Sequence, residues 1–66
     1  MAYSTYTPTS TAIARLDYDD DENMLFLTFQ DGRQYIIENF PGIEYERWKN
    51  ADSAGGYFNA NVRGKY

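Results

Sequence analysis

Residues 24–37 read MLFLTFQDGRQYII, and this stretch decides the fold because two hydrophobic runs flank a turn signal without a gap. The turn signal is Asp31-Gly32, in which glycine takes a positive φ without steric cost. Apolar side chains that alternate along such runs are typical of strands that bury one face. The stretch therefore predicts a β-hairpin on which the rest of the chain packs.

The length of the loop decides which side chains face the core, because one residue of register turns every side chain to the other face. A two-residue loop would pair Phe29 with Gln34 and set polar groups against the apolar face. A three-residue loop that ends with Gly32, in the left-handed conformation of a bulge, sets apolar side chains opposite one another. Those pairs are Leu27 with Tyr35 and Leu25 with Ile37. Burial favours the three-residue loop, which leaves Phe26 and Ile36 together on the opposite face.

The segment before the hairpin adds one strand to the predicted sheet. From Ser10 to Tyr18 small and apolar side chains alternate with charged ones. The members of one face are Ala12, Ala14, Leu16 and Tyr18. Residues 1–9 show no period and are expected to form a flexible or extended arm. Three tightly connected strands make an antiparallel meander.

After the hairpin the apolar side chains recur at a spacing of three residues in place of two. Phe40-Pro41 stops the third strand, and proline suits the first position of a helix, where its missing donor costs nothing. Tyr45, Trp48 and Ala51 then recur at spacing three. This spacing predicts a helix over Gly42–Ala51 that buries its tryptophan against the sheet.

A second, shorter helical segment is predicted near the C-terminus. Ser53 is suited to cap it, although two glycines weaken its first turn. Phe58 and Val62 at spacing four share one face, and the turn is expected to end at Gly64. The expected fold class is α+β: a three-stranded antiparallel β-meander followed by one helix and a short C-terminal helical turn, in a single domain over residues 10–66.

Composition excludes several classes of function. The chain has 66 residues, a net charge of −4, and neither cysteine nor histidine, so a disulfide framework and the usual zinc sites are excluded. Four consecutive carboxylates over Asp19–Glu22 lack the central glycine and terminal glutamate of an EF-hand loop, and a solvated acidic turn is expected. No nucleophile–base pair or phosphate loop is visible. We therefore expect a protein that is not an enzyme, with no catalytic residue, cofactor or metal.

The sequence also predicts where the protein acts. No apolar run approaches the roughly 18 residues needed to cross a bilayer, and the N-terminus lacks a basic region followed by an apolar one. We expect a cytoplasmic protein with no membrane partner. The net charge of −4 argues against sequence-independent binding to nucleic acids, which depends on neutralising phosphates, but it is compatible with a local basic patch.

The C-terminal segment gathers aromatic, amide and basic side chains and is the candidate binding surface. Its members are Tyr57, Asn59, Arg63, Lys65 and Tyr66. Arg63 has two interpretations, a contact with a phosphate or carboxylate of a ligand and a structural tie from the tail to the domain, and the structural one is favoured. Tyr35 can stack on a base at an open sheet face or pack in the core against Leu27, and core packing is favoured.

A set of apolar, aromatic and glycine positions spread along the chain forms a recognisable pattern. They are Leu25, Leu27, Phe29, Gly32, Tyr35, Phe40-Pro41, Tyr45, Trp48, Ala51, Ser53, Gly56-Tyr57-Phe58-Asn59, Val62-Arg63 and Tyr66. This pattern resembles the KTSC domain over about Ser10 to Tyr66, and its most specific part runs from Ser53 to Arg63. The family usually has Tyr-x-Tyr in its middle, and here the second position is Ile37, so any role of that hydroxyl does not carry over.

The resemblance implies a context but no established activity. The KTSC domain is found at the C-terminus of some lysyl-tRNA synthetases and as stand-alone bacterial and phage proteins. RNA binding has been suggested for this domain because it occurs in a synthetase. That suggestion rests on association with another domain and not on a mechanism of binding.

Two functions follow as hypotheses. The first is a small non-enzymatic interaction module of the KTSC type, phage-encoded or bacterial, that binds a host or bacterial macromolecule, with an unidentified protein as the expected partner. The alternative is an RNA-binding module that uses a local aromatic and basic patch near the C-terminus. The predicted sheet has an open face and two open edges, so self-association as a homo-oligomer also stays open.

Overall fold

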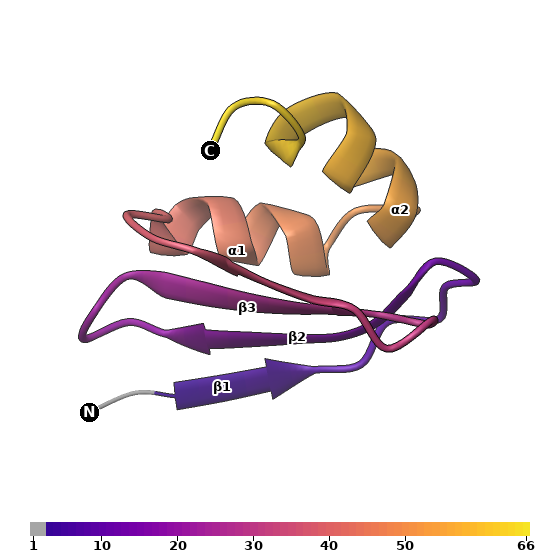
Figure 1. Cartoon of the computed structure of the whole chain (residues 1–66). Helices are drawn as coiled ribbons and strands as arrows, with labels where there is room; N and C mark the ends of the chain where they lie inside the picture. The colour runs from indigo at the N-terminus through magenta and orange to yellow at the C-terminus, as the bar shows by residue number, and fades with distance from the viewer. Residues whose placement is uncertain (1–2) are drawn as a thin grey trace.

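The computed structural model describes residues 3–66 and shows one antiparallel sheet with a helical layer on one of its faces (Figure 1). The strands are β1 (Tyr3–Tyr6), β2 (Ile13–Asp19), β3 (Met24–Phe29) and β4 (Gln34–Ile37), in that spatial order. The helices are α1 (Gly42–Lys49), α2 (Ala54–Tyr57) and the π-helical turn η1 (Phe58–Val62). The α+β class is confirmed. No helix in the described part of the chain is long and apolar enough to span a membrane.

The hairpin register predicted from side-chain parity is confirmed. The opposed pairs of β3 and β4 are Leu25 with Ile37, Phe26 with Ile36, and Leu27 with Tyr35. The loop closes through the Phe29 N–H, which donates to the Arg33 carbonyl at 2.8 Å. Gly32 has a φ of 94°, the left-handed conformation that the three-residue loop requires. Parity and burial were therefore sufficient to choose between the two loops.

The expectation of three strands is wrong, because the sheet has four. Part of the expected arm is extended and forms β1, which pairs antiparallel with β2. The Thr5 hydroxyl donates to the Asp17 carboxylate at 2.6 Å, and the Ser4 and Tyr45 hydroxyl oxygens lie 2.7 Å apart. A polar arm thus finds partners on β2 and α1 that are distant in sequence. Residues 1 and 2 of the arm lie outside the described residues.

The inward face of β2 also differs from the prediction. The pairing of β2 with β3 shifts between Ile13 and Arg15, which is the mark of a β-bulge. The bulge inserts one extra residue into β2 and so reverses the inward and outward alternation of the side chains before it. Ile13 therefore joins Leu16 and Tyr18 in the core. Ala12, which was expected to face inward, is exposed.

The predicted burial of Trp48 under the helical layer is confirmed, since its side chain is 1% exposed. α1 begins at Gly42, with Pro41 as the N-cap residue and not the first helical one, and it ends at Lys49. The Trp48 indole N–H donates to the Ala54 carbonyl at 3.1 Å and so links α1 to α2. The core is formed by Ile13, Leu16, Tyr18, Leu25, Leu27, Phe40, Tyr45, Trp48, Ala54 and Val62.

Candidate functional site

The C-terminal segment that carries the candidate residues is built from two kinds of helical turn. α2 begins after Ser53, whose hydroxyl accepts a hydrogen bond from the Gly56 N–H at 3.1 Å. In η1 the Arg63 N–H donates to the Phe58 carbonyl at 2.8 Å, the five-residue step of a π-helix, which is frequent at functional sites. This turn ends with Val62 buried in the core and Arg63 exposed.

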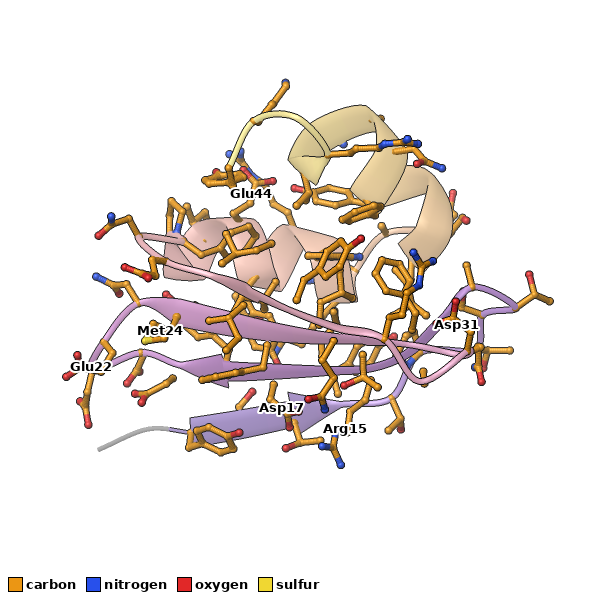
Figure 2. All side chains as sticks on the ribbon, in the orientation of Figure 1. Arg15, Asp17, Glu22, Met24, Asp31 and Glu44 are labelled. Atoms are coloured by element: carbon orange, nitrogen blue, oxygen red, sulfur yellow. The ribbon has the colours of Figure 1, made fainter. Side chains whose placement is uncertain are left out.

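Two of the five candidate residues, Tyr57 and Tyr66, attach the tail to α1. The Tyr57 hydroxyl donates to a Glu44 carboxylate oxygen, and its ring stacks on Trp48 with the centroids 5.9 Å apart. The Tyr66 ring packs on Phe40 with the centroids 4.8 Å apart, and its hydroxyl lies 3.5 Å from the other Glu44 oxygen. Burial and then the Glu44 charge raise the pKa of the Tyr66 phenol. Figure 2 shows Glu44 on the side of α1 that faces the C-terminal segment, so both tyrosines are engaged within the domain.

Asn59 and Arg63 lie together on the wall of a hollow of about 300 Å³. The wall from the β3–β4 hairpin carries Arg33 and Tyr35, and Phe58 of η1 also lines the hollow. The fold thus brings two guanidinium groups, 30 residues apart in the sequence (Arg33 and Arg63), to one surface depression.

A second hollow, of about 420 Å³, adjoins the first and shares Tyr35, Phe58 and Arg63 with it. Its lining is more apolar, with Ile37 and Val62 among its members. We call the two hollows together the β4–η1 groove, lined by Arg33, Tyr35, Ile37, Phe58, Val62 and Arg63. The exposed candidate Lys65 lines neither hollow.

β4 is an edge of the sheet along this groove and offers an open backbone. Its neighbour in the described sheet is β3, and no strand follows on its other side. Directly opposed residues of an antiparallel ladder alternate between bonded and non-bonded pairs, and the pair that closes the loop is bonded. Tyr35 and Ile37 therefore direct their backbone groups to β3, whereas Gln34 and Ile36 direct theirs outward. An edge of this kind can template the addition of another strand.

Arg63 is the unpaired cation of the groove. Within residues 3–66 its guanidinium makes no hydrogen bond or ion pair, so the structural tie expected for it is not formed there. Arg33 differs, because its Nε lies 2.8 Å from the Asp31 carboxylate and its guanidinium 5.3 Å from the centre of the Phe29 ring. Hydrogen bonds from the Arg33 backbone N–H and from its guanidinium hold the pKa of Asp31 below its ordinary value. The positive charge of Arg63 is thus available to a ligand.

The hairpin side of the groove was missed at the level of sequence. Tyr35, expected in the core against Leu27, is 46% exposed, and its ring meets Phe29 edge-on with the centroids 5.3 Å apart. Ile36 is 60% exposed. The available signal was the position of this strand as the last of the meander, because a last strand has no neighbour on one side.

The acidic turn between β2 and β3 is the one group of carboxylates in residues 3–66 whose oxygens are close enough together to hold a metal ion. Oxygens of Asp19, Asp20 and Asp21 lie within 4.8 Å of one another, at the surface. The Asp19 carboxylate accepts a hydrogen bond from the Asp21 N–H at 3.0 Å, as in an Asx turn. This geometry is that of a solvated turn, and no metal function follows from it.

Comparison with known proteins identifies the family. The model of the KTSC domain matches residues 9–66. The crystal structure of a KTSC domain protein from Yersinia pestis has the same fold, with a TM-score of 0.89 and 26% sequence identity over 97% of this chain and 90% of that chain. The comparison with curated proteins found no match. The resemblance seen in the sequence is confirmed, and this chain belongs to the KTSC domain family.

Proposed function

We propose that this KTSC domain is a non-enzymatic interaction module that binds another protein through the β4–η1 groove. The observation that carries the proposal is the open edge of β4 beside an apolar hollow, with the unpaired Arg63 on its wall. Open strand edges and exposed apolar surface are features by which proteins associate.

The side chains of the groove support a protein partner. Tyr35 and Ile36 are 46% and 60% exposed, and both line the second hollow. Aromatic residues and arginine are enriched in the anchoring positions of protein interfaces. The groove therefore combines an exposed ring, a free guanidinium and apolar lining in one place.

Affinity capture from a bacterial lysate, followed by direct titration of the recovered protein, tests this proposal. Tyr35→Ala removes one wall of the groove, and Ile43→Ala removes a comparably exposed side chain from α1 as a matched control. We expect Tyr35→Ala to weaken the affinity at least about tenfold and Ile43→Ala to change it less than about twofold. Circular dichroism verifies that both variants are folded. Equal losses in the two variants, or no protein retained above the bare support, would contradict the proposal.

The RNA-binding alternative draws on the cations near the same surface, Arg33, Arg63 and Lys65. The net charge of −4 weighs against it, and of the two aromatic residues of the tail the Tyr57 ring is half-buried and stacked on Trp48, while Tyr66 packs on Phe40 and stays 50% exposed. Fluorescence anisotropy with labelled, mixed-sequence single-stranded RNA at low salt separates the two functions. We expect no binding, whereas binding that fades steeply as salt rises would favour the alternative.

A further inference from the structure

We infer that the occupant of the β4–η1 groove is an extended peptide segment that adds to β4 as a fifth strand. The segment places an acidic side chain against Arg63 and apolar side chains two residues away on either side. This inference rests on the proposed function and names the class of partner that the groove takes.

The backbone of β4 selects an extended partner. The backbone groups of Gln34 and Ile36 point away from β3, at the spacing of a strand. A peptide in the β conformation pairs with these groups, as in other cases of strand addition. A helical partner has no free backbone groups to offer and would leave those of Gln34 and Ile36 desolvated and unpaired at the interface.

The side chains beside β4 select the pattern of the peptide. Successive side chains of an added strand point alternately into the groove and away from it. Arg63 lines both hollows and thus stands at the middle of the groove, with the first hollow on one side and the second on the other. A groove-facing residue in the middle of the peptide meets this guanidinium, and the groove-facing residues two positions before and after it enter the hollows.

The charge of the groove selects a carboxylate for the middle position. The Arg63 guanidinium has no partner within residues 3–66, and the Arg33 guanidinium stands on the wall of the same hollow. Arginine and carboxylate form strong, bidentate hydrogen bonds. An aspartate or glutamate side chain within the segment fits this place, because a C-terminal carboxylate at the middle of the groove would leave one of the two hollows empty.

The lining of the hollows selects apolar side chains for the flanking positions. The first hollow is lined by Ile13, Phe29 and Phe58 in addition to its polar groups. The second is lined by Ile37 and Val62. The predicted pattern is therefore apolar-x-acidic-x-apolar, in which x faces away from the groove.

Selection of short random peptides displayed on phage against the whole chain tests this pattern. We expect the selected peptides to share an acidic residue with apolar residues two positions away on both sides. Selected peptides without an acidic residue, or with apolar residues at the helical spacing of three and four, would overturn the inference.

Amide hydrogen exchange measured by NMR on the complex with a selected peptide tests strand addition. The amides of Gln34 and Ile36 point to solvent in the free protein, and we expect their exchange to slow at least about tenfold in the complex. Exchange that stays fast at both amides would overturn strand addition. N-methylation of alternate peptide bonds adds a second measurement, because methylation in one of the two phases removes the hydrogen bonds to β4 and should abolish binding. Equal binding in both phases would also overturn it.

The role of Arg63 is tested with a matched pair of variants. Arg63→Gln should weaken binding of the selected peptide at least about tenfold, and Arg47→Gln, which removes an exposed cation from α1, should change it less than about twofold. An equal effect of the two variants would overturn the assignment of the acidic residue.

Failure of this inference and failure of the proposed function give different results. If selected peptides lack the pattern but shift the NMR signals of the groove residues, the groove still binds proteins and the inference alone fails. If no peptide is selected, or if the shifted signals lie outside the groove, both fail. Displacement of a bound peptide by mixed-sequence RNA at physiological salt would also overturn the inference in favour of RNA.

Discussion

The helical layer covers the two halves of the sheet differently. Beneath α1 the aromatic side chains are sealed, with Phe40, Tyr45 and Trp48 no more than 2% exposed. Beneath η1 the ring of Phe58 is half-buried, and two hollows remain beside it. The sequence explains the contrast, because α1 carries large rings on its inward face and α2 has Gly55-Gly56, which fills no space.

This difference separates stability from binding. In the α1 half each buried polar group has a partner: the Tyr18 hydroxyl donates to the Phe40 carbonyl at 2.6 Å, and the Trp48 indole donates to the Ala54 carbonyl. In the η1 half the Arg63 guanidinium has none within residues 3–66. Variants in the first half should have the larger effects on the free energy of unfolding, and variants of the groove residues in the second half should have the larger effects on affinity for a partner.

The largest effect is expected for Trp48→Ala. This change empties the centre of the core and removes the hydrogen bond to Ala54, so the free energy of unfolding should fall by about 3–5 kcal/mol. Urea denaturation followed by circular dichroism measures it. Phe58→Ala is the matched control in the other half of the molecule. It should lower the free energy of unfolding clearly less than Trp48→Ala does, because the Phe58 ring is half-buried. Equal losses of stability in Trp48→Ala and Phe58→Ala would contradict the contrast between the two halves of the molecule.

A smaller effect is expected for Tyr18→Phe, which keeps the ring and removes one hydroxyl. That hydroxyl donates to the Phe40 carbonyl, and its loss leaves this buried acceptor unpaired. The free energy of unfolding should fall by about 1–3 kcal/mol at neutral pH. Tyr35→Phe removes a hydroxyl from an exposed ring, so the free energy of unfolding should stay within about 0.5 kcal/mol of the wild-type value.

The same hydroxyl predicts how stability depends on pH. Burial, and then the negative charges of Asp20 and Asp19, raise the pKa of the Tyr18 phenol above its ordinary value. The folded protein thus keeps the proton at a pH at which the unfolded chain releases it. The stability that arises from this difference in the Tyr18 pKa is fully present below about pH 10, and it is lost as the pH rises through the raised pKa of the folded protein. Denaturation series across this range should show a shallower alkaline decline in Tyr18→Phe than in the wild type. Identical slopes would contradict the assignment.

A gain in stability is expected for Gly55→Ala in the half of the molecule that is loosely packed. A Cβ at this position would lie 3.6 Å from the Ala12 Cβ, an ordinary contact on the wall of the first hollow. Alanine also favours the helix over glycine, so the midpoint of urea denaturation should rise by an amount equivalent to about 0.5–1 kcal/mol. Gly56→Ala should give no such gain, because its Cβ would lie 3.2 Å from the Ser53 hydroxyl that caps α2. A larger gain for Gly56→Ala would show that packing next to Ala12 does not decide the effect.

The elements that could be predicted from the sequence are those set by local patterns. The β3–β4 register followed from the parity of Leu25 and Leu27 together with the turn at Gly32, because a different loop would have exposed the same apolar face. The burial of Trp48 followed from its spacing in a helix with one apolar side.

The elements that escaped prediction depend on partners far away in the sequence. β1 is polar and has no apolar period, and its order comes from hydrogen bonds of Ser4 and Thr5 to α1 and β2. Ile43 is apolar and lies in the first turn of α1, yet it is 62% exposed. Apolar character alone does not say which side of a short helix is covered.

Only part of the candidate site could be predicted, because the rest of it also depends on residues that are distant in the sequence. A mixed aromatic and basic tail is visible in the sequence, but not the fact that Glu44 engages the hydroxyls of Tyr57 and Tyr66. The groove forms where this tail passes the β3–β4 hairpin, and only the fold brings Tyr35 next to Arg63. Local patterns thus located one wall of the site and left the other unidentified.

The smallest effect on stability is expected for Arg63→Gln, and this variant gives the sharpest test of the contrast. Its guanidinium is exposed and unpaired within the described chain, so the free energy of unfolding should stay within about 0.5 kcal/mol of the wild type. Arg15→Gln is the matched comparison, because the Arg15 Nε lies 2.9 Å from the Asp17 carboxylate, whose side chain is 6% exposed on the sheet face away from the helices (Figure 2). Loss of that partner leaves a buried carboxylate with the Thr5 hydroxyl as its remaining contact, and the variant should be measurably less stable. If urea denaturation shows Arg63→Gln to be the less stable of the two, the arginine at the groove serves the fold and not a ligand.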